Sequence, residues 1–145
     1  MYVGIRTAEQ ARFSLEYAVS VVILDGEVSL RHFDEAVIQS AQAQRLMKKV
    51  RVFVPPDLQS LESKRNRYGE VAVYLSNGTV LRHRATQIRG QPPLFLTERE
   101  VDKKFYDCVV PALGEAKAQT LLQSLRDIEG FPRVRDIFSR LWERP

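Results

Sequence analysis

Cysteine and histidine are scarce in this sequence of 145 residues. The single cysteine, Cys108, excludes an internal disulfide framework. His32 and His83 stand far apart in polar contexts, and neither lies near the cysteine in sequence, so the ligand spacing of a zinc site is absent. We therefore predict no metal site, and we interpret both histidines as surface residues.

Long apolar runs and the common signatures of self-contained active sites are missing too. No apolar run reaches the ~20 residues that span a bilayer, so no membrane association is predicted and the cytoplasm is the default compartment. A glycine-rich phosphate loop and a Gly-x-Ser-x-Gly elbow are both absent. The composition, 44% hydrophobic and 28% charged, is typical of a soluble globular protein.

Positive charge is only mildly in excess. Lysine and arginine total 22 against 18 aspartates and glutamates, which leaves a formal charge of +4. The one dense basic cluster, residues 64–67, adjoins a single aromatic residue, Tyr68, so it lacks the interleaved aromatic side chains on which bases stack. We predict no nucleic-acid partner.

The N-terminal part of the chain predicts helices. Thr7 and Gln10 form a capping box that opens a first helix, which continues to the stop at Asp25-Gly26. From Tyr17 onward almost every side of this helix is apolar, so it needs cover on most sides. Ser29 and Ser40 are candidate N-caps of two shorter helices.

Strand signals follow these helices. Val50, Val52 and Val54 alternate with other side chains and predict a first strand. Asn77-Gly78 stands between the strand-like runs 71–75 and 79–81, which predicts a hairpin whose two turn residues both have positive φ.

The C-terminal part returns to helical spacing. Residues 97–100 form a second capping box, followed by an apolar stripe that includes Cys108, which we interpret as a buried thiol. Pro111 and Gly114 are expected to interrupt this helix, and residues 134–142 carry a further apolar stripe. The order of helices, antiparallel strands and helices predicts an α+β fold.

One charged side chain has a notable position. Arg12 lies near the start of the most hydrophobic helix, where a guanidinium and free backbone N–H groups can bind a carboxylate together. The alternative is an ordinary salt bridge or a side chain that lays its stem along apolar surface.

Several segments, in this order, resemble the MmgE/PrpD family. The family pattern has a Glu-Ala-Lys/Arg-Phe-Ser helix that runs into a glycine stop, a Leu-Met-x-Lys-Val-x-Val passage, a hairpin, and a join rich in proline before the last helices. Here Gln10 stands where glutamate is common. The matching segments are residues 7–19, 24–26, 46–52, 77–79, 90–97 and 104–105.

This resemblance implies part of a two-domain enzyme. Residues 1–96 would form an α+β lid, and residues 97–145 would be helices that return to an N-terminal helical domain that this sequence does not match. Family members act on small di- or tricarboxylates as 2-methylcitrate dehydratases, cis-aconitate decarboxylases or iminodisuccinate epimerases, and the resemblance implies no cofactor. The main acid and base residues lie in the helical domain, so this chain alone is expected to be inactive. A free-standing binding or protein-interaction module is the alternative.

The resemblance also raises Arg12 to a candidate substrate ligand, with Ser14, Tyr17 and Tyr2 as weaker companions. Each companion has an alternative. Ser14 could bond only to backbone, and Tyr17 could be a core residue whose hydroxyl has a partner within the protein. Tyr2 could belong to a disordered terminus. Because the last helices would lack the domain on which they pack, we expect the chain to self-associate.

Overall fold

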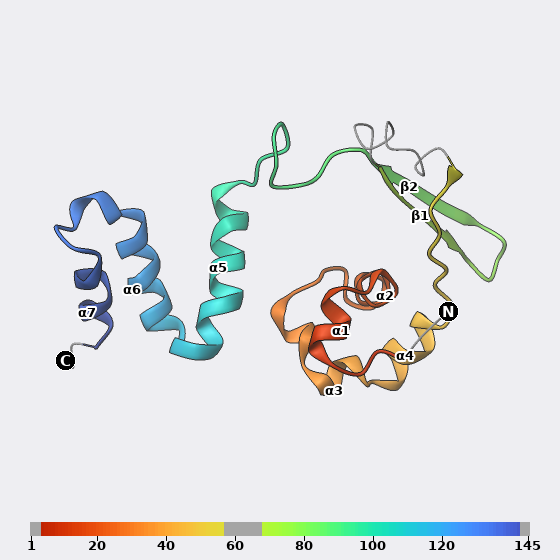
Figure 1. The fold of residues 1–145 in the computed structure, drawn as a ribbon, viewed down its shortest axis with the longest axis horizontal. Coiled ribbons are helices and arrows are strands. Elements are labelled where there is room, and N and C mark those ends of the chain that lie inside the picture. The colour runs from red at the N-terminus through yellow and green to blue at the C-terminus, as the bar shows by residue number, and fades with distance from the viewer. Residues whose placement is uncertain (1–3, 57–67, 143–145) are drawn as a thin grey trace. The chain divides into compact units, whose positions relative to one another are not determined.

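A computed structural model describes residues 4–56 and 68–142 of the chain, with side chains as far as residue 139 (Figure 1). Helices come first, an antiparallel pair of strands follows, and helices end the chain, which confirms the predicted α+β class. The described elements are α1 (Ala8–Arg12), α2 (Leu15–Asp25), η1 (Leu30–Phe33), α3 (Glu35–Ile38), α4 (Ala41–Met47), β1 (Gly69–Tyr74), β2 (Val80–Ala85), α5 (Glu98–Leu113), α6 (Glu115–Arg126), η4 (Ile128–Gly130) and α7 (Val134–Trp142).

The chain divides into two compact units. One contains residues 1–51 together with 98–145, and the other contains residues 52–97. The predicted boundary between a lid and returning helices refers to a larger enzyme and remains a prediction.

The first predicted helix is two helices. Thr7 caps α1 in a capping box with Gln10, as expected, but α1 ends at Arg12. Ser14 has extended backbone and accepts a hydrogen bond from the backbone N–H of Tyr17, so it is the N-cap of a new helix, α2. A serine hydroxyl that bonds the chain three residues later competes with a continuous helix. The prediction of one uninterrupted helix was wrong at this point.

The end of α2 and the start of α4 follow the sequence prediction. Gly26 ends α2 in the left-handed conformation, with φ of 80°. Ser40 caps α4 by accepting from the backbone N–H of Ala43. Between them, the single helix predicted after Ser29 is split into η1 and α3.

A small apolar core joins these N-terminal helices. α2 packs against α4, and both contribute side chains that solvent does not reach. Only one face of α2 is covered within this core. The buried members are Ile5, Ala11, Tyr17, Val21, Ile38, Ala43 and Met47, with Ala8 and Phe33 partly buried against them.

The second unit contains the predicted hairpin, in which β1 pairs with β2 from Gly69↔Ala85 to Tyr74↔Val80. At its turn, the N–H of Gly78 donates to the carbonyl of Leu75, and Gly78 has φ of 84°. Asn77 does not have positive φ, so the prediction for both turn positions was wrong. A turn followed by one left-handed glycine is the three-residue hairpin connection, in which only the glycine needs positive φ.

The predicted strand at Val50 to Val54 is not a strand among the described residues. Alternation of apolar residues indicates two faces, but a strand also needs a neighbour in register. The described sheet consists of β1 and β2 alone.

The C-terminal helices form a second, smaller core. α5 packs against α6 and α6 against α7, with Leu121 and Ile137 buried and Phe105, Val109, Leu113 and Phe131 partly buried around them. α5 continues through Pro111 and ends only before Gly114, so the predicted interruption at the proline was wrong. Cys108 is exposed, which corrects the interpretation of a buried thiol. No helix of the described residues is long and apolar enough to cross a membrane.

Candidate functional site

The candidate cation Arg12 lies in the last turn of α1, and not in the first turns of the long apolar helix as predicted. Its side chain is exposed, and its guanidinium carbon lies 5.9 Å from the centre of the Phe33 ring. Among the residues that the structure describes, no carboxylate forms an ion pair with Arg12. The guanidinium of Arg12 is therefore available to bind an anion from solution, while the Phe33 ring supports one of its faces.

The two companion residues beside Arg12 have partners of their own. Ser14 accepts from the N–H of Tyr17 and donates its hydroxyl proton to Glu16, at 3.0 Å in both cases. Tyr17 is buried, and its hydroxyl donates to the carbonyl oxygen of His32. Both side chains thus shape the segment around Arg12, and a direct contact with substrate would require them to exchange partners. The fourth predicted residue, Tyr2, lies outside the described residues.

A buried histidine connects this segment to the end of α2. His32 is 1% exposed, which corrects the interpretation of a surface residue. Its Nε2 lies 3.0 Å from Oδ2 of Asp25, and its Nδ1 lies 2.9 Å from the backbone nitrogen of Ser29. The polar neighbours of His32 in sequence concealed this burial. The signal that was available is the spacing Ser29-x-x-His32, which matches a capping box with histidine in place of glutamate.

The buried position of Tyr17 also alters its acidity. Removal of its hydroxyl from water raises the pKa of Tyr17 above the ordinary value of 10.0, and the nearby charge of Asp25 raises it further. The phenol therefore remains a neutral hydrogen-bond donor at physiological pH, as its contact with the carbonyl of His32 requires.

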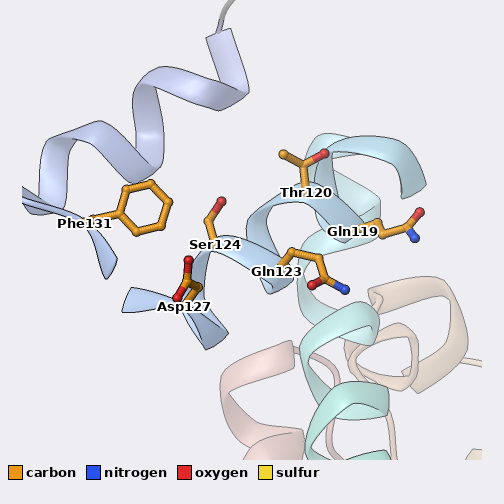
Figure 2. A pocket seen from close by; sticks show the side chains of 6 residues that line it. All are labelled: Gln119, Thr120, Gln123, Ser124, Asp127 and Phe131. Atoms are coloured by element: carbon orange, nitrogen blue, oxygen red, sulfur yellow. The ribbon is translucent and has the colours of Figure 1, made fainter. Parts of the chain in front are cut away.

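Neither of two hollows lined by described residues of the first unit suits a polyanion. The first, about 420 Å³, lies beside α6 and η4 (Figure 2). Among the described residues that line it, the charged one is Asp127, which repels carboxylates; the others are Gln119, Thr120, Gln123, Ser124 and Phe131. The second, about 440 Å³, has one cation, Arg31, and two carboxylates, Asp34 and Asp107, in its lining. No cluster of three metal-binding side chains occurs in the described part of the chain.

Comparison with known proteins identifies the family. A sequence model described as the MmgE/PrpD C-terminal domain matches residues 4–129, which is most of the chain. This chain belongs to the MmgE/PrpD family. The match takes in α1, the Arg12 segment, the hairpin and the helices up to η4.

The MmgE/PrpD relatives include the cis-aconitate decarboxylases of human and mouse. The human protein is 27% identical over 120 residues, which cover 83% of this chain and 24% of the relative. The mouse protein is 26% identical over 123 residues, covering 83% of this chain and 25% of the relative. The chain thus spans about a quarter of the length of the curated relatives that it matches.

Proposed function

We propose that this chain is the lid portion of an MmgE/PrpD enzyme that acts on a small di- or tricarboxylate. In this proposal the lid closes over substrate bound on an N-terminal helical domain, which supplies the acid and base residues. The reaction would remove water or carbon dioxide, or epimerise a centre, beside a carboxylate. The resemblance to cis-aconitate decarboxylases over the lid region supports this substrate class.

The observation that carries the proposal is the uncovered apolar surface of α2. Tyr17, Ser20 and Val21 form its buried face. Large apolar side chains on its other sides remain exposed, although a helix this apolar requires cover on most sides. They are Leu15, Val22, Ile23 and Leu24. A helical domain that packs on α2 would supply the missing cover and place the α1–α2 junction at the domain boundary.

At that boundary Arg12 would bind a substrate carboxylate. Its guanidinium has donors for a bidentate contact and no competing carboxylate in the described structure. A site closed between two domains excludes water, which strengthens this contact and stabilises charge that develops on the carboxylate during reaction. Lysine, the other residue of the family pattern at this position, offers the positive charge but lacks the paired N–H donors of a guanidinium.

Two measurements test the proposal. The purified chain is expected to show no turnover of cis-aconitate or 2-methylcitrate, because the acid and base groups are assigned to the other domain. In a full-length enzyme that contains this chain, Arg12→Ala should lower kcat/KM by ~10- to 100-fold, with partial recovery in Arg12→Lys. Turnover by the chain alone, or normal kcat/KM in Arg12→Ala, would overturn the respective part of the proposal.

An interaction module is the second candidate, favoured by the apolar face of α7. Val134 and Phe138 are exposed although they belong to the same apolar stripe as the buried Ile137. An uncovered stripe favours association with another chain, including a second copy. Light scattering that reports a strict monomer at high concentration would contradict self-association. A chain that dimerises and binds no polycarboxylate would favour the module over the lid.

A further inference from the structure

We infer that Asp25 and His32 are positioning residues: the contact between them holds η1 so that Phe33 supports the guanidinium of Arg12, and it thereby sets the affinity for a carboxylate ligand. The inference rests on the proposed function, because it concerns the cation that we assign to substrate. It adds two residues that sequence reasoning left out of the site.

The hydrogen bonds of His32 indicate which ring nitrogen donates and which accepts. The backbone N–H of Ser29 can only donate, so Nδ1 of His32, at 2.9 Å, must accept. Nε2 is then the donor, toward Oδ2 of Asp25 at 3.0 Å. His32 is 1% exposed, so its ring is shielded from solvent while the carboxylate of Asp25 stays partly exposed, and His32 ties the start of η1 to the last residue of α2.

Asp25 is an unusual residue at this place. It is the last residue of α2, where free carbonyl groups disfavour a negative charge. The N–H of His32 Nε2 offsets that repulsion. The carboxylate side chain is nevertheless 45% exposed, so its removal leaves no cavity in the core. Substitution of Asp25 consequently tests the contact with His32 and not the packing of α2.

Three further contacts connect His32 to Arg12, the residue proposed to bind substrate. The carbonyl of His32 accepts from the Tyr17 hydroxyl, so the residue is held both at its ring and at its backbone. Phe33 follows directly, with its ring centre 6.3 Å from that of Tyr17 and tilted by 54°. The guanidinium carbon of Arg12 lies over the Phe33 ring, 5.9 Å from the ring centre. A shift of η1 therefore displaces the aromatic surface on which Arg12 rests.

The test uses the 145-residue chain and two NMR readouts. The shift of the Arg12 Nε–H resonance reports how closely Arg12 lies to the Phe33 ring. Titration with cis-aconitate reports carboxylate binding, and the trimethyl ester of cis-aconitate is the uncharged control. Asp25→Ala should move the Arg12 resonance and weaken cis-aconitate binding by about tenfold, or about 1.4 kcal/mol, which lies within the coupling energies of residues in one hydrogen-bond network.

Conservative variants separate positioning from general stability. Asp25→Asn retains an oxygen that accepts from His32 and should restore both readouts. His32→Gln retains a donor toward Asp25 and should perturb Arg12 less than His32→Ala. Glu129→Ala removes an exposed carboxylate from η4 and should change neither readout.

Each outcome has a distinct meaning. Wild-type binding that persists unchanged in Asp25→Ala would overturn the inference and leave the proposed function intact. A wild-type chain that does not bind cis-aconitate, while Asp25→Ala still moves the Arg12 resonance, would overturn the affinity role and retain the positioning. The proposed function fails separately, if Arg12→Ala leaves kcat/KM normal in the full-length enzyme. Equal losses in Asp25→Ala and Asp25→Asn would also contradict the inference, because the acceptor oxygen would then be irrelevant.

Discussion

The N-terminal helices and the hairpin unit differ in what holds them together. In the helices, Tyr17, Ile38 and Met47 are at most 1% exposed. In the unit of residues 52–97, no described residue is buried. The helices therefore depend on contacts between segments distant in sequence, whereas the hairpin depends on its turn and on pairs across two strands. Substitutions should have large effects in the first region and small ones in the second.

The largest effect is expected at Ile38, which is fully buried among α1, α2 and α4. Ile38→Ala should lower the free energy of unfolding by about 2–5 kcal/mol, from lost apolar burial and an unfilled cavity. Its matched control is Ile88→Ala in the hairpin unit, where the side chain is 66% exposed and the change should stay within about 0.5 kcal/mol. Equal urea-unfolding midpoints for the two variants would contradict the expected difference in sensitivity between the helices and the hairpin unit.

A smaller effect is expected at Tyr17, which links α2 to η1. Tyr17→Phe leaves the carbonyl of His32 without its donor and should lower the free energy of unfolding by roughly 1–2 kcal/mol. The same hydroxyl gives a pH dependence. Because the pKa of Tyr17 is raised in the folded chain, its contribution is complete below pH 10.0 and is lost as pH rises through the folded value. The unfolded chain ionises first and is favoured at alkaline pH.

Urea denaturation between neutral and alkaline pH measures this dependence. The alkaline decline should be shallower in Tyr17→Phe than in the wild type. Tyr74→Phe, in which the ring is 73% exposed, is the control and should leave the decline unchanged. A decline identical in all three proteins would assign the alkaline sensitivity to other groups.

Within the hairpin, the turn glycine should matter most. Gly78→Val places a β-branched residue at φ of 84° and should destabilise the hairpin by ~1 kcal/mol or more, although no neighbouring atom lies within 4 Å to clash. Amide exchange across β1 and β2 should become faster, while exchange in α2 and α4 stays unchanged. Gly69→Ala, at negative φ, should do neither. Faster exchange throughout the chain would mean that the hairpin stabilises the helices.

The smallest effect is expected for the ion pairs between β1 and β2. Glu70 accepts from Arg82 and from Arg84, and these hydrogen bonds hold the pKa of Glu70 below its ordinary value of 4.5. Since that pKa is lowered on folding, the stabilisation is present above pH 4.5 and is lost as pH falls through the folded value. Carbon-detected NMR titration should show a low Glu70 midpoint that rises in Arg82→Ala and in high salt. An unchanged midpoint in Arg82→Ala would assign the shift to Arg84.

Local sequence patterns were sufficient where the cause is local. The capping box of Thr7 and Gln10, the cap at Ser40, the glycine stop at Gly26 and the hairpin at Gly78 were all predicted from residues within a few positions of one another. Each depends on hydrogen bonds or φ values inside one short segment. The α+β class follows from the order of these segments, and the family follows from their ordered resemblance.

Patterns were insufficient where a residue has two competing local uses. Ser14 can sit inside a helix or cap one, and the cap prevailed and split the first helix. Pro111 can end a helix or occupy its interior, and α5 continued through it. Apolar alternation at Val52 indicates a strand only when a neighbour is in register. The candidate ligands Arg12, Ser14 and Tyr17 remain predictions, although their positions beside one junction are now defined.

The most informative residue is His32, because its neighbours in sequence indicate an exposed side chain, whereas its neighbours in the folded chain bury it. The charged residues Arg31 and Asp34 lie close to it in sequence and suggest an exposed position. Its ring is buried because Asp25, from the end of another helix, accepts a hydrogen bond from its Nε2, and because the Tyr17 hydroxyl donates to its carbonyl oxygen. Short-range chemistry thus specified the caps, turns and element order of this chain. The packing of α1, α2 and η1 decided that His32 is buried next to Phe33, the residue that Arg12 contacts. Burial of a polar ring depends on partners that only folding brings within hydrogen-bonding distance.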